Sequence, residues 1–146
     1  MITQSVSERR QQTNKLIQEL LEERQAVWAE YGAIAAMRPF GPDQPLEIEL
    51  RKFCQVMIDY VCLGHFGIYQ RIAEGNERRR KVVEVAERIY PRVTEVTDAA
   101  VAFNDKYEAL DGVSLRRSLA DDLSRLGEEL AARFELEDSL IQAMLD

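Results

Sequence analysis

The strongest constraint on how this chain can fold is an apolar stripe that runs without a miss from residue 82 to residue 110. Apolar side chains recur there at steps of three and four, at Val82, Val85, Ile89, Val93, Val96, Ala100, Phe103, Tyr107 and Leu110. That spacing places them on one face of an α-helix. We therefore expect a helix over residues 77–110, and its apolar face must be covered by other elements.

A proline lies inside this stripe. Pro91 lacks the backbone N–H that an interior helical residue donates, so it weakens the helix locally. The apolar stripe nevertheless keeps its phase on both sides of the proline. We therefore expect a kink at Pro91 and not the end of the helix.

Three further segments show the same helical period, at residues 5–37, 46–74 and 115–145. In the last of them Glu137 falls on the apolar line, so we expect that face to broaden onto Leu136, Leu140 and Met144. The acidic clusters of this segment are interpreted as its solvated faces, namely Asp121-Asp122, Glu128-Glu129 and Glu135-x-Glu137-Asp138. Four long amphipathic helices with short links predict an all-α fold, an antiparallel four-helix bundle made of one domain over residues 1–146.

Proline and glycine mark the breaks between these segments, at RPFGPDQP (38–45), Gly75-Asn76 and Asp111-Gly112. Residues that commonly cap helices lie beside the breaks. Asn76 and Ser114 are expected to cap the third and fourth helices, and Gly75 to end the second. At the start of the chain, Ser5 with Glu8 fits a capping box.

Composition narrows the class of protein. No apolar run approaches the ~18–20 residues that span a bilayer, and the first residues do not form a secretory signal, so we expect a cytoplasmic protein. Cys54 and Cys62 fall on one expected helix, about 12 Å apart along its axis. A disulfide joins Cα atoms no more than about 7 Å apart, so free thiols are expected.

Charge is distributed unevenly along the chain. The net charge is −7, but the run ERRRK at 77–81 carries four positive charges and one negative, which leaves −10 on the rest of the chain. Such a surface repels nucleic acid and suits a basic protein partner. The basic run opposes the helix macrodipole at a helix start, and we interpret it as solvated. We expect no direct nucleic-acid binding and no membrane binding.

The single histidine, His65, follows Asp59 and Cys62, and these residue types together raise the possibility of a metal site or an active site. Metal-binding bundles use Glu-x-x-His pairs on two helices, and the chain has none, so we expect no metal and no cofactor. A Cys–His pair on one helix face has no third orienting group and no oxyanion hole, so we do not expect an enzyme. Phosphotransfer through His65, or a role as a signalling adaptor, stays open as the alternative, although Ile68 stands where such domains typically have a lysine.

The segment 46–74 has two different faces on a helical projection. Phe53, Met57, Tyr60, Gly64 and Ile68 form a core-facing stripe, with His65 at the edge of the core. On the other side Asp59, Cys62 and Phe66 follow one another at i, i+3 and i+7, with Leu63 beside them. Apolar side chains bounded by polar groups on an outward face often mark protein interfaces. The same spacing is equally consistent with Phe66 packing against the end of a neighbouring helix.

The stretch FCQVMIDYVCLGHFGIYQRI at 53–72 closely resembles the signature of the Rsd/AlgQ family, the regulators of sigma D. NKLI at 14–17 and LGEELAARFELEDSLIQAMLD at 126–146 agree with it in the same order. Two departures stand out: Cys62-Leu63 replaces a pair that is often Ser-Ala, and Leu20 replaces an expected tryptophan.

The resemblance implies a bacterial anti-sigma factor. Family members are helical bundles that bind the promoter-recognising C-terminal region, region 4, of the primary sigma-70-class factor. They keep it from core RNA polymerase and from DNA, which favours alternative sigma factors in stationary phase. By motif, the family's contact positions match Asp59, Cys62 and Phe66, and Leu63 joins them on the same face.

Overall fold

The computed structural model describes residues 2–73, 75 and 77–145, without the side chains of residues 2–7, 9, 66 and 73. Its elements are α1 (Ile2–Ala35), α2 (Leu46–Gly64), the π-helix η1 (His65–Tyr69), α3 (Gln70–Ala73), α4 (Arg80–Ala109) and α5 (Gly112–Leu145). There is no strand among these residues, so the all-helical prediction is confirmed. None of the described helices is long and apolar enough to cross a membrane.

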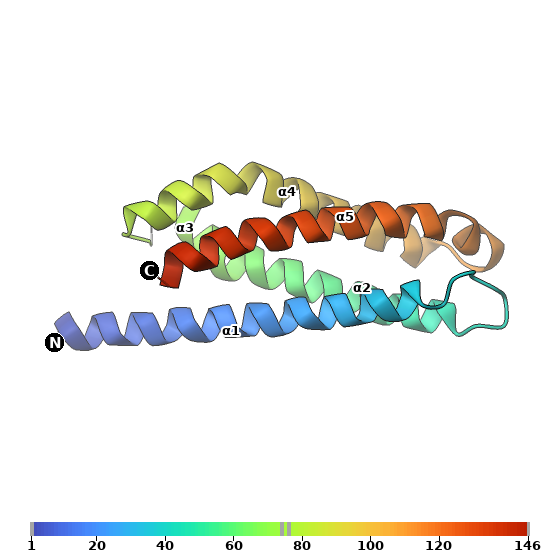
Figure 1. Ribbon diagram of the computed structural model, residues 1–146, viewed down its shortest axis with the longest axis horizontal. Helices are drawn as coiled ribbons and strands as arrows, with labels where there is room; N and C mark the ends of the chain where they lie inside the picture. The colour runs from blue at the N-terminus through green and yellow to red at the C-terminus, as the bar shows by residue number, and fades with distance from the viewer. Residues whose placement is uncertain (1, 74, 76, 146) are drawn as a thin grey trace.

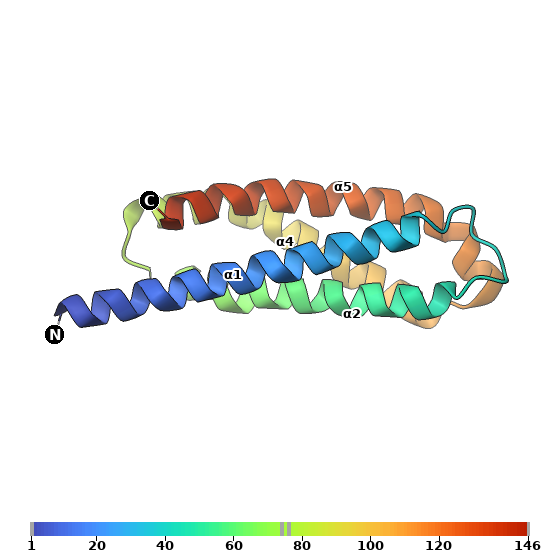
Figure 2. The ribbon, with the colours of Figure 1, turned by 60° about the horizontal axis from the view of Figure 1, so that its bottom comes forward.

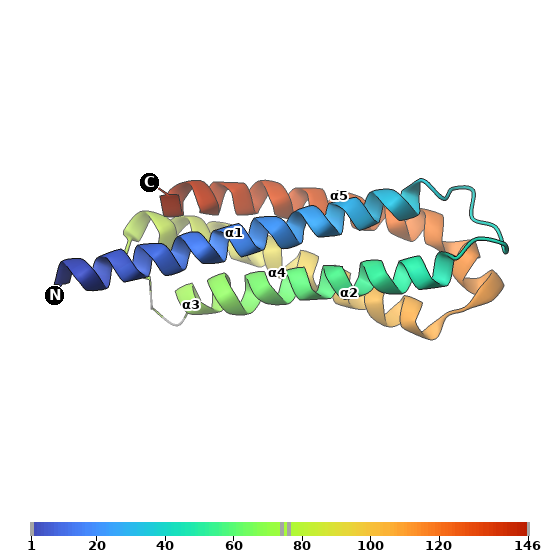
Figure 3. The ribbon, with the colours of Figure 1, turned by 90° about the horizontal axis from the view of Figure 1, so that it is seen from below.

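The four long helices lie alongside one another, and each runs opposite to the next along the chain (Figures 1 and 2). α1 lies beside α2 and α5, and α4 lies beside α2 and α5. Seen from below, α1 crosses in front of the gap between α5 and α2 (Figure 3). The α1–α2 connection and the α4–α5 turn therefore meet at one end of the molecule, whereas both chain termini lie toward the other end.

The core follows the stripe that the period of residues 82–110 predicts. Of those nine positions, Val85 and Leu110 are partly buried and the other seven are buried. α4 continues through Pro91 without a break, and the kink there stays a prediction. On α1, the large apolar side chains of Leu21 and Trp28 remain 37% and 48% exposed. The Trp28 ring stacks on Tyr31 instead of entering the core.

Helix starts depart from the predicted caps. α1 already includes Ser5, so the capping box at Ser5 and Glu8 is wrong. α4 begins at Arg80 with Arg79 in the N-cap position, and Asn76 lies outside the described residues, as does Glu74. Gly75 has φ of +80°, the left-handed conformation that suits the end of a helix.

The start of α5 is set by a side chain from another helix. α5 begins at Gly112, so Ser114 lies within the helix and is not its N-cap. The backbone N–H of Gly112 donates to Glu47 Oε1 of α2 at 3.2 Å. A carboxylate at this point satisfies a free donor and complements the helix dipole. A local capping motif is not needed here, because the tertiary contact with Glu47 already satisfies the free N–H group at the start of the helix.

Candidate protein-binding face

The outward face of α2 presents the residues that the sequence singled out. Asp59 and Cys62 are exposed, and Leu63 is half-buried against the apolar core. Gln55 Nε2 donates to Asp59 Oδ1 at 3.0 Å, which holds the carboxylate along the helix surface. The side chain of Phe66 lies outside the described residues. The structure thus brings three of the four predicted contact residues to one face.

A hollow of about 360 Å³ opens beside this face, between α1 and α2. Val56, Leu63 and Ala26 are its apolar lining residues, and the remaining lining residues are carboxylates, namely Glu19, Glu22, Glu23 and Asp59. We call these seven residues the acidic groove. Three of its four carboxylates come from α1, and sequence reasoning missed them. The only signal for them was the negative charge of the chain outside the ERRRK run.

Like charges crowd the acidic groove. The pKa of Glu23 is raised, first because the carboxyl is partly desolvated and then because the charges of Asp59 and Glu19 lie close to it. No lysine or arginine lines the groove within the part of the chain that the structure describes. Ionised carboxylates that repel one another are relieved when a cation approaches. The groove is therefore electrostatically suited to a basic partner.

The helix changes type immediately after this face. Residues 65–69 form a π-helix, in which Gln70 N–H donates to the carbonyl of His65, five residues back. The prediction of one regular α-helix from Leu46 to Glu74 is wrong here. A π turn is wider than an α turn, so residues after Gly64 are rotated relative to an α-helical projection. The alignment of Phe66 with Asp59 and Cys62 therefore cannot be taken from α-helical spacing alone.

The inward face of α2 meets a buried ionic network. Arg133 and Glu137 of α5 are 0% and 1% exposed, and Arg133 Nε donates to Glu137 Oε1 at 3.0 Å. Tyr60 Oη of α2 also donates to Glu137, and Arg133 Nη1 donates to Thr97 Oγ1 of α4 at 2.7 Å. The apolar face does extend to Leu140 and Met144, and Glu135 and Asp138 are exposed as predicted, but the prediction that Glu137 is solvated is wrong. The carboxylate stays in the core because Arg133 and Tyr60 satisfy it.

Burial controls the ionisation of this network. Desolvation raises the pKa of Glu137, although Arg133 and the Tyr60 hydroxyl oppose that shift. Desolvation also raises the pKa of Tyr60, and the charge of Glu137 adds to it. Arg24 of α1 approaches Glu137 Oε2 at 3.8 Å and pairs with Asp138 at 2.8 Å. Side chains from α1, α2 and α5 therefore surround one carboxylate, and Thr97 of α4 joins the network through Arg133.

A side chain from α5 approaches Gly64 closely. A Cβ at this position would lie 2.8 Å from Arg133 Nη2 and 3.6 Å from Leu20 Cδ1. The guanidinium thus occupies the space that any larger residue would need. Glycine at this point lets α2 pack against the buried network.

The chemistry considered for His65 gains no support from its surroundings. His65 is half-buried, consistent with the edge of the core, and phosphotransfer remains a prediction. No group of three potential metal ligands occurs among the described residues. Both cysteines are free on α2, with Cys54 buried and Cys62 exposed, as expected. Burial raises the pKa of the Cys54 thiol to about 12, because the charged form is desolvated.

Comparison with known proteins identifies the family. Residues 1–145 match the family model described as regulator of RNA polymerase sigma(70) subunit, Rsd/AlgQ. The chain belongs to the Rsd/AlgQ family. The resemblance carried by residues 53–72 is therefore confirmed across the chain. No solved structure matches this chain significantly.

Curated relatives from enteric bacteria agree. The "Regulator of sigma D" of Yersinia enterocolitica is 33% identical over 150 residues, covering 95% of this chain and 86% of the relative. The protein of the same name from Salmonella paratyphi A is 31% identical over 147 residues, with 98% and 90% covered. That of Shigella dysenteriae is 31% identical over 153 residues, with 97% and 91% covered.

Proposed function

We propose that this chain, as an antiparallel four-helix bundle, is a non-catalytic anti-sigma factor of the bacterial cytoplasm. It binds region 4 of the primary sigma-70-class factor through Asp59, Cys62, Leu63 and Phe66. Binding sequesters the sigma factor from core RNA polymerase and from promoter DNA, which favours alternative sigma factors in stationary phase. Membership of the Rsd/AlgQ family, whose description is a regulator of the sigma(70) subunit, supports this assignment.

The observation that best supports this binding site is that the exposed contact residues predicted from the motif lie directly beside the acidic groove. Asp59 belongs to both, and Leu63 lines the groove beside the exposed Cys62. Region 4 is implied by the resemblance to be a basic helix-turn-helix module. A basic helix can place apolar side chains on Val56 and Leu63 and its cations beside the four carboxylates. Such electrostatic complementarity accelerates encounter and selects the partner.

The same contacts account for inhibition. The basic side chains with which a helix-turn-helix module approaches the phosphates of DNA are those that an acidic groove attracts. A region 4 seated on this face has those side chains covered, so DNA and this protein compete for one surface. Stoichiometric occlusion requires no chemical step, which fits a non-catalytic regulator.

Binding of purified sigma region 4 to substituted proteins tests the site. Phe66→Ala should weaken the complex by about 30-fold or more, as removal of an interface hot spot does. Asp59→Ala should weaken it by about tenfold through loss of a charge-assisted contact. Asp98→Ala and Val101→Ala, at exposed positions on α4, serve as controls and should bind like the parent protein. Unchanged affinity in both test variants would contradict the site, and absence of binding by the parent protein would contradict the function.

The contribution of the acidic groove is measured separately by association kinetics. Changing Glu19, Glu22 and Glu23 together to glutamine should slow association about tenfold at low salt. It should also flatten the dependence of the rate on salt. A control with the same change in net charge replaces the exposed Glu87, Asp98 and Glu108 of α4 with their amides. Equal slowing of both triple variants would assign the effect to net charge and remove the groove from the proposal.

A further inference from the structure

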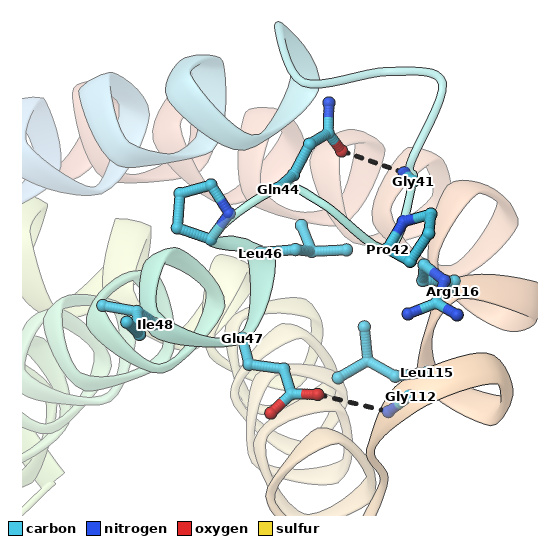
Figure 4. A pocket seen from close by; sticks show the side chains of 10 residues that line it. Gly41, Pro42, Gln44, Leu46, Glu47, Ile48, Gly112, Leu115 and Arg116 are labelled. Carbon is cyan, nitrogen blue, oxygen red and sulfur yellow. Dashed lines mark hydrogen bonds between the residues drawn. The ribbon is translucent and has the colours of Figure 1, made fainter.

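A second candidate site opens at the end of the molecule where the two helix connections meet. The α1–α2 connection and the start of α5 bound a pocket of about 240 Å³ (Figure 4). Pro42, Leu46 and Leu115 provide apolar walls, and Ile48 at its edge is 69% exposed. Along α2, Glu47 of this pocket precedes Asp59 by twelve residues, roughly 18 Å of helix. The pocket is thus separate from the proposed sigma-binding face.

Hydrogen bonds hold the walls of this pocket in place. The Gln44 side chain accepts from the Gly41 backbone at 3.0 Å and donates to the Met37 carbonyl at 2.7 Å. On the other wall, Glu47 accepts from Gly112 N–H (Figure 4). The connection is therefore tied to itself, and α2 is tied to α5. Ligand sites are usually formed before the ligand arrives, and this pocket meets that condition.

One charged side chain in the pocket has no acceptor. Arg116 is half-buried and makes no hydrogen bond or ion pair with any residue that the structure describes. By contrast, Arg24, Arg92 and Arg133 each pair with carboxylates. Among the described residues that line the pocket, Glu47 alone is acidic, and its Oε1 already accepts from Gly112 N–H. Figure 4 shows the Arg116 side chain next to Pro42 and Leu115.

We propose that this pocket binds a small carboxylic acid with a short apolar chain. The carboxylate pairs with the planar fork of Arg116, which matches its geometry with two parallel hydrogen bonds. The apolar chain lies against Pro42, Leu46 and Leu115. The volume is below the range of about 300–1,000 Å³ typical of drug-sized ligands, so the ligand is small. This proposal does not depend on the sigma-binding function.

Three probes separate the two parts of the proposed ligand. Hexanoate carries both a carboxylate and an apolar chain, acetate lacks the chain, and 1-hexanol lacks the charge. Titrated into the full chain and followed by amide NMR shifts, hexanoate should bind saturably with a Kd of about 1 mM, so that the shifts are half complete near that concentration. The shifts should centre on residues 41–48 and 112–116. Acetate and 1-hexanol should each bind at least tenfold more weakly.

A pair of neighbouring arginines gives the control for the charge. Arg116→Gln should weaken hexanoate binding at least tenfold, and Arg117→Gln, at an exposed position on the same helix, should leave it unchanged. Arg116→Lys keeps the charge without the fork and should fall between them. Absence of saturable shifts in the parent protein would overturn the proposal. So would equal binding by the Arg116→Gln and Arg117→Gln proteins, or equal binding of hexanoate and 1-hexanol.

Discussion

The two faces of α2 differ in whether the carboxylates beside them are paired with a cation. On the outer face Asp59 shares the acidic groove with three glutamates of α1, and no cation lines that groove among the described residues. On the inner face, one helical position away, Tyr60 reaches a single carboxylate, Glu137, that Arg133 also pairs. In the inner arrangement the carboxylate is paired with a cation from the same chain, although Arg133 Nη2 has no hydrogen-bond partner among the described residues, whereas the carboxylates that line the outer groove face no such cation there. We propose that the inner charges serve the fold and the outer ones serve binding.

The largest expected effect comes from opening the inner network. Arg133→Met introduces an apolar side chain of similar length and removes the cation that hydrogen-bonds to buried Glu137, which leaves only Arg24, at 3.8 Å, among the described residues. Breaking a buried pair in this way costs about 3–5 kcal/mol, because an uncompensated charge remains in the core. Urea unfolding at pH 7 measures the loss. Arg125→Met on the same helix, where the arginine is 75% exposed in its pair with Asp122, should lose less than about 1 kcal/mol.

The sign of the pH dependence provides a second check on the same variant. Burial raises the folded-state pKa of Glu137, so ionised Glu137 destabilises the folded chain. That penalty is absent below the unfolded-state pKa and grows as the pH rises through and above it. Without Arg133 the penalty increases, so Arg133→Met should regain stability as the pH falls from 7 toward 5. A stability difference from the parent that stays constant over this range would show that lost packing, and not charge, causes the defect.

A smaller loss of stability is expected from a substitution at Gly64, where α2 packs against the guanidinium of Arg133. Gly64→Ala improves helix propensity by about 1 kcal/mol, but its Cβ would lie 2.8 Å from Arg133 Nη2. Because Arg133 is fully buried and hydrogen-bonded, it cannot move freely, and overpacking typically costs about 1–3 kcal/mol. We expect a net loss of stability in urea unfolding. Gly32→Ala in α1, with nothing within 4 Å of its added Cβ, should instead be neutral or stabilising.

The smallest expected effect lies on the outer face and has the opposite sign. Glu23→Gln removes a carboxylate whose pKa is raised by partial desolvation and by the charges of Asp59 and Glu19. A raised pKa means that the ionised side chain destabilises the fold once the pH exceeds the unfolded-state value. The variant should melt about 1 °C higher at pH 7, and the gain should vanish near pH 4. Glu87→Gln on exposed α4 serves as the control in the same calorimetric scans.

Periodicity predicted most of the helical structure, because apolar spacing depends only on neighbours three and four residues away. It placed the start of α2 at Leu46 and the buried positions Phe53, Met57 and Tyr60 correctly. It failed at His65–Tyr69, where the backbone adopts a π turn that no local spacing marked. Periodicity did place Glu137 on the apolar line, but its charge made a solvated position the expectation, because the contact with Tyr60 of another helix could not be predicted from local spacing.

The candidate site was predictable only where it lies on one helix. Asp59 and Cys62 were assigned to the outward face from their spacing, and the structure agrees. The glutamates at 19, 22 and 23 were not assigned, because their relation to Asp59 depends on how α1 lies against α2. The capping of Gly112 by Glu47 was missed for the same reason, since those residues are 65 positions apart.

The sequence by itself determined the helical class, the core stripe of α4 and the family motif at residues 53–72, because each depends only on residues that are close together in the chain. The tertiary structure decided which charges would be solvated, shared or buried. A carboxylate's free energy depends on every group within a few ångströms, whatever its place in the chain. Thus Glu23 and Glu137, both glutamates on amphipathic helices, came to lie in an open groove and in a closed core.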